Sequence, residues 1–180
     1  YFPGAQEEAD KTEEVADYEQ THGERPIITG TGEARILRVR SLDSEGREKE
    51  NFTTGEAITV AVTFKTLEPI ERPVIGVALF RNDDLYVFGP NTRFDGIEKM
   101  EGTYDGIYTY FIHYPRLPLL EGVYRISVAL YDQNHIRPHV WHNQLYEIRV
   151  SCPRPDHGVV EIPHHWGLVK HVSGSREELP

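Results

Sequence analysis

Residues able to do chemistry are concentrated in the last third of the chain, where seven of the nine histidines follow residue 130. His135, His139 and His142 lie close together along the chain, with Asp132 as the nearest carboxylate. Imidazoles beside a carboxylate can bind a transition metal, so a metal-assisted enzyme acting on carbohydrate is one interpretation. Their spacing matches no established metal signature, and histidines that bond a ligand or solvent from a polar loop explain the same residues. We therefore expect neither a metal nor another cofactor.

Other catalytic signatures are missing from the sequence. It has no phosphate-binding loop, dinucleotide fingerprint, nucleophile elbow or His-Glu-x-x-His motif. Cys152 is the single cysteine, so no disulfide forms within the chain, and it stands beside Pro153 with no neighbour that would activate it. The carboxylates of Asp83 and Asp84 could act on glycosidic bonds, but adjacent acids at this place are typical of a turn. We predict that the protein is not an enzyme.

The elements that position these residues are strands. Ile58, Val60, Val62 and Phe64 alternate with polar or small residues, which is the period of a half-buried strand. Further strands are expected over residues 34–42 (with a bulge), 74–81, 85–88, 107–114, 123–130 and 145–150. Turn residues separate these runs, and no convincing helix follows residue 29. The pattern predicts an all-β fold, an antiparallel β-sandwich.

Charge divides the chain into three parts. Of a net charge of −10, residues 1–25 carry eight acids and two bases, so we interpret residues 1–29 as an acidic arm or linker. Residues 30–168 form the predicted sandwich, and residues 169–180 form a tail. The acidic balance argues against binding to nucleic acid or to an anionic membrane surface. Without an initial methionine, the chain is interpreted as a piece of a longer protein.

A stiff connector precedes the last predicted strand. Residues 151–155 contain two prolines, and Gly158 to Ile162 then reads as one more short strand. Such a strand could fold back on its own sandwich or cross to a second copy of the chain, as in domain-swapped dimers. The sequence alone leaves both arrangements open.

One face of the predicted sheet suggests a ligand-binding groove. If Ile126 and Val128 point into the core, Arg125, Ser127 and Tyr131 point outward, as does Phe80 on another strand. Gly76, Ala78 and Ala129 would then form a floor of small residues between aromatic walls, with Arg125 as a fixed donor. Sugars bind to flat rings and planar donors of this kind. Alternatively, the exposed rings pack under a loop or against a partner.

The segment from His139 to Asn143 is a candidate rim for this groove. Trp141 supplies a large ring, and His139, His142 and Asn143 supply polar groups beside it. These residues follow Pro138 and precede the strand expected at 145–150. Alternatively, Trp141 fills one end of the sandwich, which is a common position for tryptophan in such folds.

A family resemblance is carried by several motifs in order. They are Gly32-Glu-Ala-Arg-Ile, Phe52-Thr-Thr-Gly-Glu, Val77-Ala-Leu-Phe-Arg, Val87-Phe-Gly-Pro-Asn-Thr, Leu117-Pro-Leu-Leu-Glu-Gly-Val-Tyr, Ser127-Val-Ala-Leu-Tyr-Asp, Trp141-His and the stretch from Gly158 to Trp166. Over about residues 30–168 the chain resembles the C-terminal polysaccharide-binding domain of Wzt-type ATP-binding subunits, from ABC transporters that export bacterial O-antigen.

That resemblance implies an immunoglobulin-like β-sandwich that dimerises by exchanging its C-terminal strand. It implies a non-catalytic domain that recognises a lipid-linked O-polysaccharide for export. Its partners would be the glycan, a second copy, and the ATPase domain and membrane subunit of the transporter. Its location would be cytoplasmic, at the inner face of the inner membrane. The alternative function is a structural or protein-interaction sandwich that docks to the transporter's ATPase domain.

Overall fold

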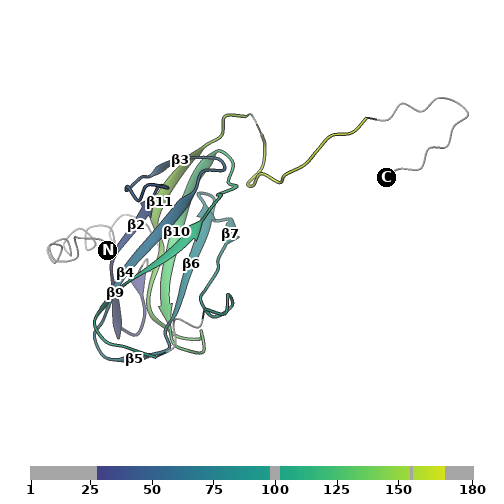
Figure 1. Ribbon diagram of the computed structural model, residues 1–180. Helices are drawn as coiled ribbons and strands as arrows, with labels where there is room; N and C mark the ends of the chain where they lie inside the picture. Colours follow the sequence, from purple (N-terminus) through teal and green to yellow (C-terminus); the bar gives the residue numbers. More distant parts are fainter. Residues whose placement is uncertain (1–27, 98–101, 155, 169–180) are drawn as a thin grey trace, which may run out of the picture.

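The computed structural model describes residues 28–97, 102–154 and 156–168. In this part of the chain all regular structure is β, and two sheets lie one in front of the other (Figure 1). The expected immunoglobulin-like sandwich is therefore confirmed. None of the described residues forms a helix with the length and hydropathy needed to cross a bilayer.

The larger sheet contains six strands. Its path runs β1 (Ile28–Thr29), β11 (Pro138–Ser151), β10 (Gly122–Tyr131), β6 (Val74–Arg81) and β7 (Tyr86–Phe88), with every pairing antiparallel. The short β3 (Asn51–Thr53) adds to the far end of β11 in parallel. The β10–β6–β7 part of this sheet carries most of the groove residues expected from the sequence.

The smaller sheet contains β2 (Ala34–Leu42), β4 (Ile58–Thr66) and β9 (Ile107–Tyr114), in that order and antiparallel. A separate two-stranded sheet pairs β5 (Ile70–Glu71) with β8 (Thr103–Tyr104). In Figure 1, β5 lies at the opposite end of the sandwich from β3. The β2 register shifts between Ile36 and Arg38, which is the bulge expected in this strand.

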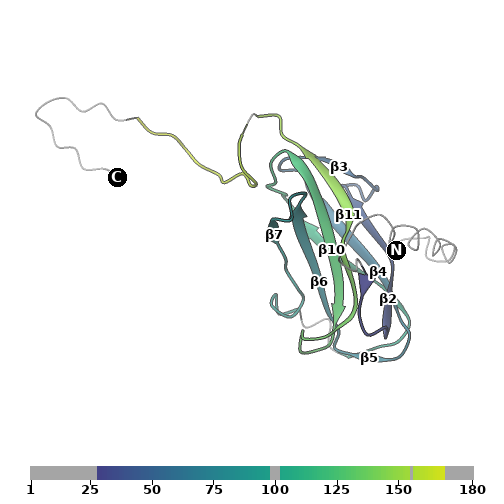
Figure 2. The ribbon, with the colours of Figure 1, turned by 180° about the vertical axis from the view of Figure 1, so that it is seen from behind.

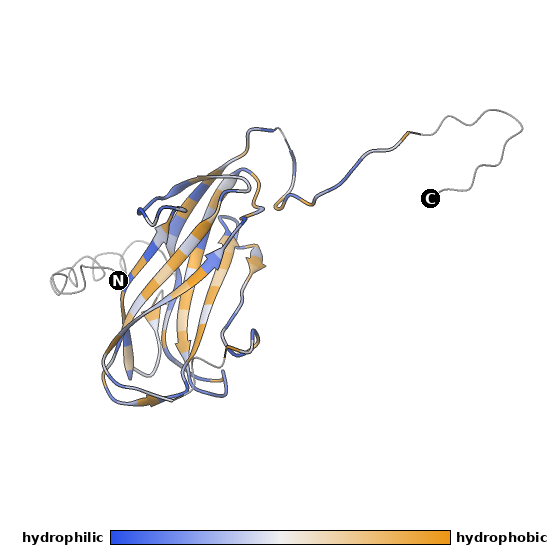
Figure 3. Ribbon diagram, viewed as in Figure 1, coloured by the Kyte–Doolittle hydropathy of each residue, from blue (hydrophilic) through white to orange (hydrophobic). Residues whose placement is uncertain are grey.

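The core forms where the two inner faces meet. Alternate residues of β4 and β10 are almost fully buried, including Val60, Val62, Ile126 and Val128, each at 2% exposure or less. Tyr124 lies in the same cluster at 0% exposure. Figure 3 shows the resulting bands of apolar and polar residues along the strands. Burial of this alternating set holds the sheets together and fixes which side chains face outward.

Strand β11 differs from the expected element. It begins at Pro138 rather than near residue 145, so Trp141, His142 and Asn143 lie within a strand. The pairing with β10 is irregular between Ile126 and Val128, and Gln144 has a φ of 53°. This bulge interrupts the alternation, which is why the segment resembles a loop in sequence.

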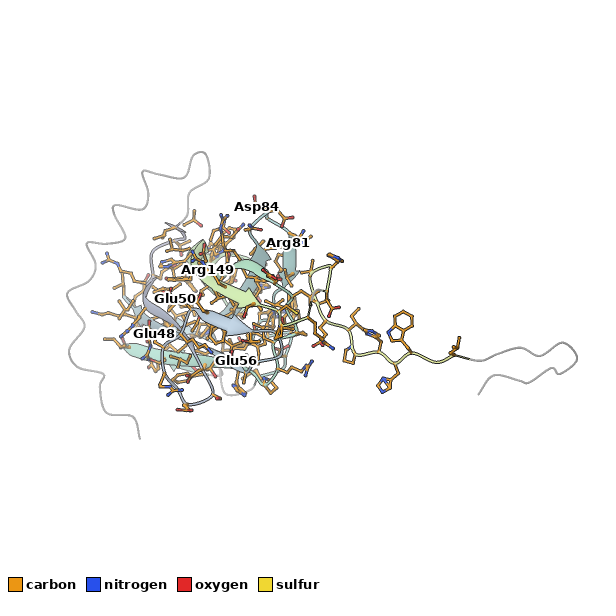
Figure 4. The ribbon with its side chains drawn as sticks, turned by 90° about the horizontal axis from the view of Figure 1, so that it is seen from above. Glu48, Glu50, Glu56, Arg81, Asp84 and Arg149 are labelled. Carbon is orange, nitrogen blue, oxygen red and sulfur yellow. The ribbon has the colours of Figure 1, made fainter. Side chains whose placement is uncertain are left out.

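The chain after β11 contacts the sandwich once more before it leaves it. Val159 is half-buried against the core, and its carbonyl accepts a hydrogen bond of 2.9 Å from the Leu120 amide. The expected strand over Gly158–Ile162 thus reduces to a single bridge between Leu119 and Val160 in this chain. The last described part of the chain extends away from the body, as Figures 2 and 4 show.

Candidate functional site

The outer face of β10 and β6 brings several predicted site residues together. The register pairs Arg125 with Phe80, Ser127 with Ala78, and Ala129 with Gly76. Small residues therefore lie side by side in the middle of this face, as the alternation indicates. Phe80 stands toward one end of the floor, and Tyr131 ends β10 at the other.

Tyr86 on β7 is a further aromatic residue of this face that sequence analysis missed. Its ring meets Phe80 edge to face, with 5.0 Å between ring centroids. The phenol oxygen lies over Gly89, where a Cβ atom would collide with it and would also contact Ala78. Tyr86 is 57% exposed, so its ring covers the small floor and still presents surface to solvent. The sequence predicts a strand over residues 85–88, but the three-residue edge strand β7 has too little alternation to show which of its rings faces outward.

Tyr131 completes an aromatic platform formed by Phe80, Tyr86 and Tyr131. The Tyr131 ring packs against His135 with centroids 4.5 Å apart. Burial, together with the nearby Tyr86 hydroxyl, raises the pKa of Tyr131. The phenol therefore stays protonated at neutral pH and offers both a ring face and a hydroxyl that can donate a hydrogen bond.

Arg125 supplies a positive charge at the Phe80 end of the platform. It is paired with Glu147 of β11 on one side and Phe80 of β6 on the other. Its Nη1 lies 4.0 Å from a carboxylate oxygen of Asp84, and its side chain is 36% exposed. Figure 4 shows Asp84 beside Arg81 at this rim of the sandwich. A half-exposed pair at that distance contributes little stability, so the guanidinium keeps donors for a ligand.

Ser127 and Asn143 are less available to a ligand than the sequence predicts. Ser127 is 3% exposed and its hydroxyl donates to Asn143 Oδ1 at 3.3 Å. The Gln144 amide donates to the same hydroxyl at 2.7 Å. These bonds tie the β11 bulge to β10. Asn143 is half-buried, so its amide group borders the face while Ser127 positions it.

Trp141 and His142 point to opposite sides of the larger sheet. Trp141 is half-buried and pairs with Ala129, whose position is on the outer face. His142 is 5% exposed, and its Nδ1 lies 2.7 Å from the Tyr146 hydroxyl inside the sandwich. Burial lowers the pKa of His142 to about 4. The structure therefore does not bring His142 to the groove, although its sequence neighbour Trp141 lies there.

His139 lies at the β5 end of the sandwich, away from the platform. Its Nδ1 donates to Glu33 at 2.6 Å, and the ring lines a cavity of about 330 Å³. The loop 132–137 forms one wall of this cavity, and its other side carries His135, which packs on Tyr131. The rim predicted from His139 to Asn143 is thus divided between an outer face, an interior and an end cavity.

The three histidines that suggested a metal site are held apart by different partners. His135 contacts Tyr131, His139 contacts Glu33, and His142 contacts Tyr146. Within residues 28–97, 102–154 and 156–168, no group of three or more His, Cys, Asp or Glu residues is placed to hold a metal ion. Asp83 and Asp84 lie in the turn between β6 and β7, where Asp83 pairs with Arg81.

Comparison with known families gives one match over most of the chain. A family model described as the Wzt C-terminal domain matches residues 26–162. No curated protein matches the chain in a search by sequence.

Comparison with solved structures identifies the same fold. The crystal structure of the C-terminal domain of wzt superposes with a TM-score of 0.72 at 14% identity, covering 84% of this chain and 95% of that one. The CARDB domain of the PF1109 protein from Pyrococcus furiosus, in complex with di-metal ions, gives a TM-score of 0.37 at 13% identity, covering 69% of this chain and 99% of that one.

Proposed function

The chain belongs to the family of Wzt C-terminal domains, and from this premise we propose that it is a non-catalytic carbohydrate-binding domain. Its ligand would be a lipid-linked O-antigen polysaccharide that an ABC transporter exports. Residues 30–168 would form the glycan-binding domain, residues 1–29 the linker to an ATPase domain, and residues 169–180 a tail. The domain would work in the cytoplasm, at the inner face of the inner membrane.

The aromatic platform is the observation that supports this function best. Phe80, Tyr86 and Tyr131 lie over a floor of small residues on the outer face of the larger sheet. Pyranose rings stack on such faces through their C–H groups, and Arg125 at the edge can donate to hydroxyl oxygens. We expect weak binding per site, with a Kd of about 0.1–1 mM.

Titration with the O-polysaccharide of the source organism tests this proposal. The readout is calorimetry or NMR, with an unrelated polysaccharide as the negative control. We expect saturable, selective binding, with shifts at Phe80, Tyr86, Arg125 and Tyr131. Tyr131→Ala should abolish binding while leaving the domain folded, and unchanged affinity in this variant would remove the proposed site.

A matched control is available on the other sheet. Phe111 lies on the outer face of β9 and is 49% exposed, similar to the exposure of Tyr86. Phe111→Ala removes an exposed ring of comparable size from the smaller sheet, which does not carry the platform. It should therefore leave glycan affinity unchanged. Equal losses in Phe111→Ala and Tyr131→Ala would show that binding depends on general stability and not on the platform.

We further propose that the domain forms a homodimer through its C-terminal segment. Ile162, Trp166 and Leu168 are 71%, 92% and 98% exposed in the single chain. Apolar side chains on an extended segment are typical of a strand that pairs with another molecule. Removing residues 156–180 should convert a dimer into a monomer in light scattering, whereas a monomer with the segment intact would refute this arrangement. A dimer would also raise affinity for a repeating glycan by avidity.

A further inference from the structure

The outer face of the smaller sheet is basic, although the chain as a whole has a net charge of −10. Its three strands, β2, β4 and β9, contain four Lys and Arg residues and no acidic residue. Lys65 belongs to β4, and Arg35, Arg38 and Arg40 belong to β2, the strand at one edge of this sheet. The aromatic platform is on the other sheet, so the two surfaces are separate.

A bulge brings the three arginines of β2 to the same side. In a regular strand, Arg35 would point to one face, and Arg38 and Arg40 would point to the other. The pairing of β2 with β4 is shifted between Ile36 and Arg38. Beyond this shift Arg38 and Arg40 are opposite outward residues of β4, so they join Arg35 on the outer face. Ile36 and Val39 pack against the core instead.

Most of this positive charge has no counterion among the residues that the structure describes. Arg38 lies 2.9 Å from a carboxylate oxygen of Glu48, but Arg35, Arg40 and Lys65 form no ion pair with a described residue. Arg35 and Lys65 are both exposed, and they are directly opposite each other in the register. Like charges at opposite positions of neighbouring strands are destabilising. A negatively charged segment on this face would offset that repulsion.

The acidic arm has the opposite charge and joins the sandwich beside β2. Residues 7–19 contain seven acids and one base. The arm leads into β1, which pairs with β11 at the edge of the larger sheet, and residues 30–33 connect β1 directly to β2.

The arm is long enough to reach the basic face. The segment from Glu19 to Ile28 spans at most about 30 Å when it is extended. The outward arginines, from Arg35 to Arg40, extend over about 17 Å of strand. Residues 7–19 can therefore lie along β2 without any change in the sandwich.

We propose that residues 7–19 of the arm dock on the basic face of β2 and β4 in their own chain. A single pair of exposed charges contributes little stability, but several carboxylates that meet four cations form a network. Because the arm is tethered to β1, its effective concentration at this face is high, and no partner has to be captured from solution.

Docking would fix the path of the residues that precede the sandwich. In the proposed transporter these residues are the linker, so a docked arm would set where the domain lies relative to the ATPase domain. The inference does not depend on glycan binding, because the platform is on the larger sheet. Glycan affinity should accordingly be the same whether or not the arm is docked.

A spin label on the arm tests the docking in the full chain. Cys152→Ser removes the native thiol, and Thr12→Cys then places a nitroxide in the middle of the acidic run. We expect the amide signals of residues 35–40 and 63–65 to broaden in NMR spectra at low salt. The broadening should disappear in about 1 M salt, where the Debye length is about 3 Å. Absence of broadening at low salt would overturn the proposal.

Charge reversal with a matched control identifies the face. Arg35→Glu combined with Lys65→Glu should abolish the broadening. Arg72→Glu combined with Arg149→Glu makes the same change in net charge at exposed positions outside the smaller sheet, so the broadening should remain. The melting temperature checks that both variants are folded. Broadening that persists in the first variant, or that is lost equally in both, would refute docking on this face.

A mixed sample distinguishes the chain's own arm from that of a second copy. Isotope-labelled chain without a nitroxide is combined with spin-labelled chain at natural isotope abundance. We expect no broadening in this mixture, and broadening would show that the arm docks on another molecule and would overturn docking within one chain. If the polysaccharide titration fails while the broadening depends on Arg35 and Lys65, the docking stands and the glycan proposal falls.

Discussion

The hydroxyl of Tyr86 occupies the space that a side chain at position 89 would need. Gly89 has no Cβ, and the phenol oxygen of Tyr86 lies where that atom would be, close to Ala78. A glycine on the chain after β7 thus leaves room for the Tyr86 phenol against the larger sheet. The orientation of the platform depends on this pair of residues.

Replacing Gly89 with alanine is expected to displace Tyr86 without unfolding the domain. The colliding atoms belong to the far end of a flexible side chain, which can rotate away. Because one stacking surface is lost, glycan affinity should fall about three- to tenfold. Calorimetry measures the affinity and thermal melting the stability. Retention of full affinity in Gly89→Ala would show that Tyr86 does not contact the glycan.

Replacing Tyr124 with phenylalanine should loosen the C-terminal segment. The buried Tyr124 hydroxyl donates to the Leu120 carbonyl at 2.8 Å and lies 3.3 Å from the Val159 carbonyl. Its loss should cost about 1 kcal/mol of unfolding free energy. Hydrogen exchange should speed up at two amides that join the segment to the sandwich: that of Leu120, which donates to the Val159 carbonyl, and that of Glu161, which donates to the Pro118 carbonyl. Tyr108→Phe is the control: it removes a half-buried hydroxyl that donates to the Asp105 carbonyl, and it should leave those amides protected.

The free energy of unfolding should decrease as the pH is lowered, because of His142. Burial lowers its pKa to about 4 from the ordinary 6.5, so the unfolded chain binds a proton between these values that the folded chain does not. Stability is therefore lost as pH falls through this window and changes no further through this residue below about pH 4. The loss between pH 7 and pH 5 should be about 2 kcal/mol in urea denaturation.

His142→Gln provides the comparison for this pH effect. Glutamine does not titrate and can still bond the Tyr146 hydroxyl, so the variant should lose less stability between pH 7 and pH 5. Parallel pH curves for the wild-type protein and the variant would show that His142 is not the group responsible.

Replacing Gly30 with alanine should detach β1 from β11. Gly30 has a φ of 143°, and a Cβ atom there would collide with the backbone of His139 and Val140. Since backbone cannot move aside as a side chain can, we expect a loss of about 2–4 kcal/mol in unfolding free energy. Gly32→Ala is the matched control, because Gly32 also has a positive φ of 93° but open space around it. Equal losses in the two variants would contradict the role of the collision.

Regular alternation made the strands predictable. The run from Ile58 alternates without interruption, and the structure gives β4 from Ile58 to Thr66. Ile107–Tyr114 and Val74–Arg81 also match the expected bounds. In these strands one face packs against the other sheet, so the period of the sequence indicates directly which side chains face inward.

The site residues were harder to place because bulges break that period. Trp141 faces out and His142 faces inward beside Tyr146, as neighbours along a strand do, but the irregularity at the left-handed Gln144 makes this part of β11 resemble a loop in the sequence. Glu33 and His139, which are 106 positions apart, meet only through tertiary structure. No local pattern signals such a pair.

One loop borders both surfaces described above. Residues 132–137 line the end cavity, while His135 of the same loop packs on Tyr131 of the platform. A displacement of this loop at one surface therefore moves residues that border the other. Any two ligands whose binding biases the position of this loop would be linked reciprocally, each altering the affinity of the other by the same factor.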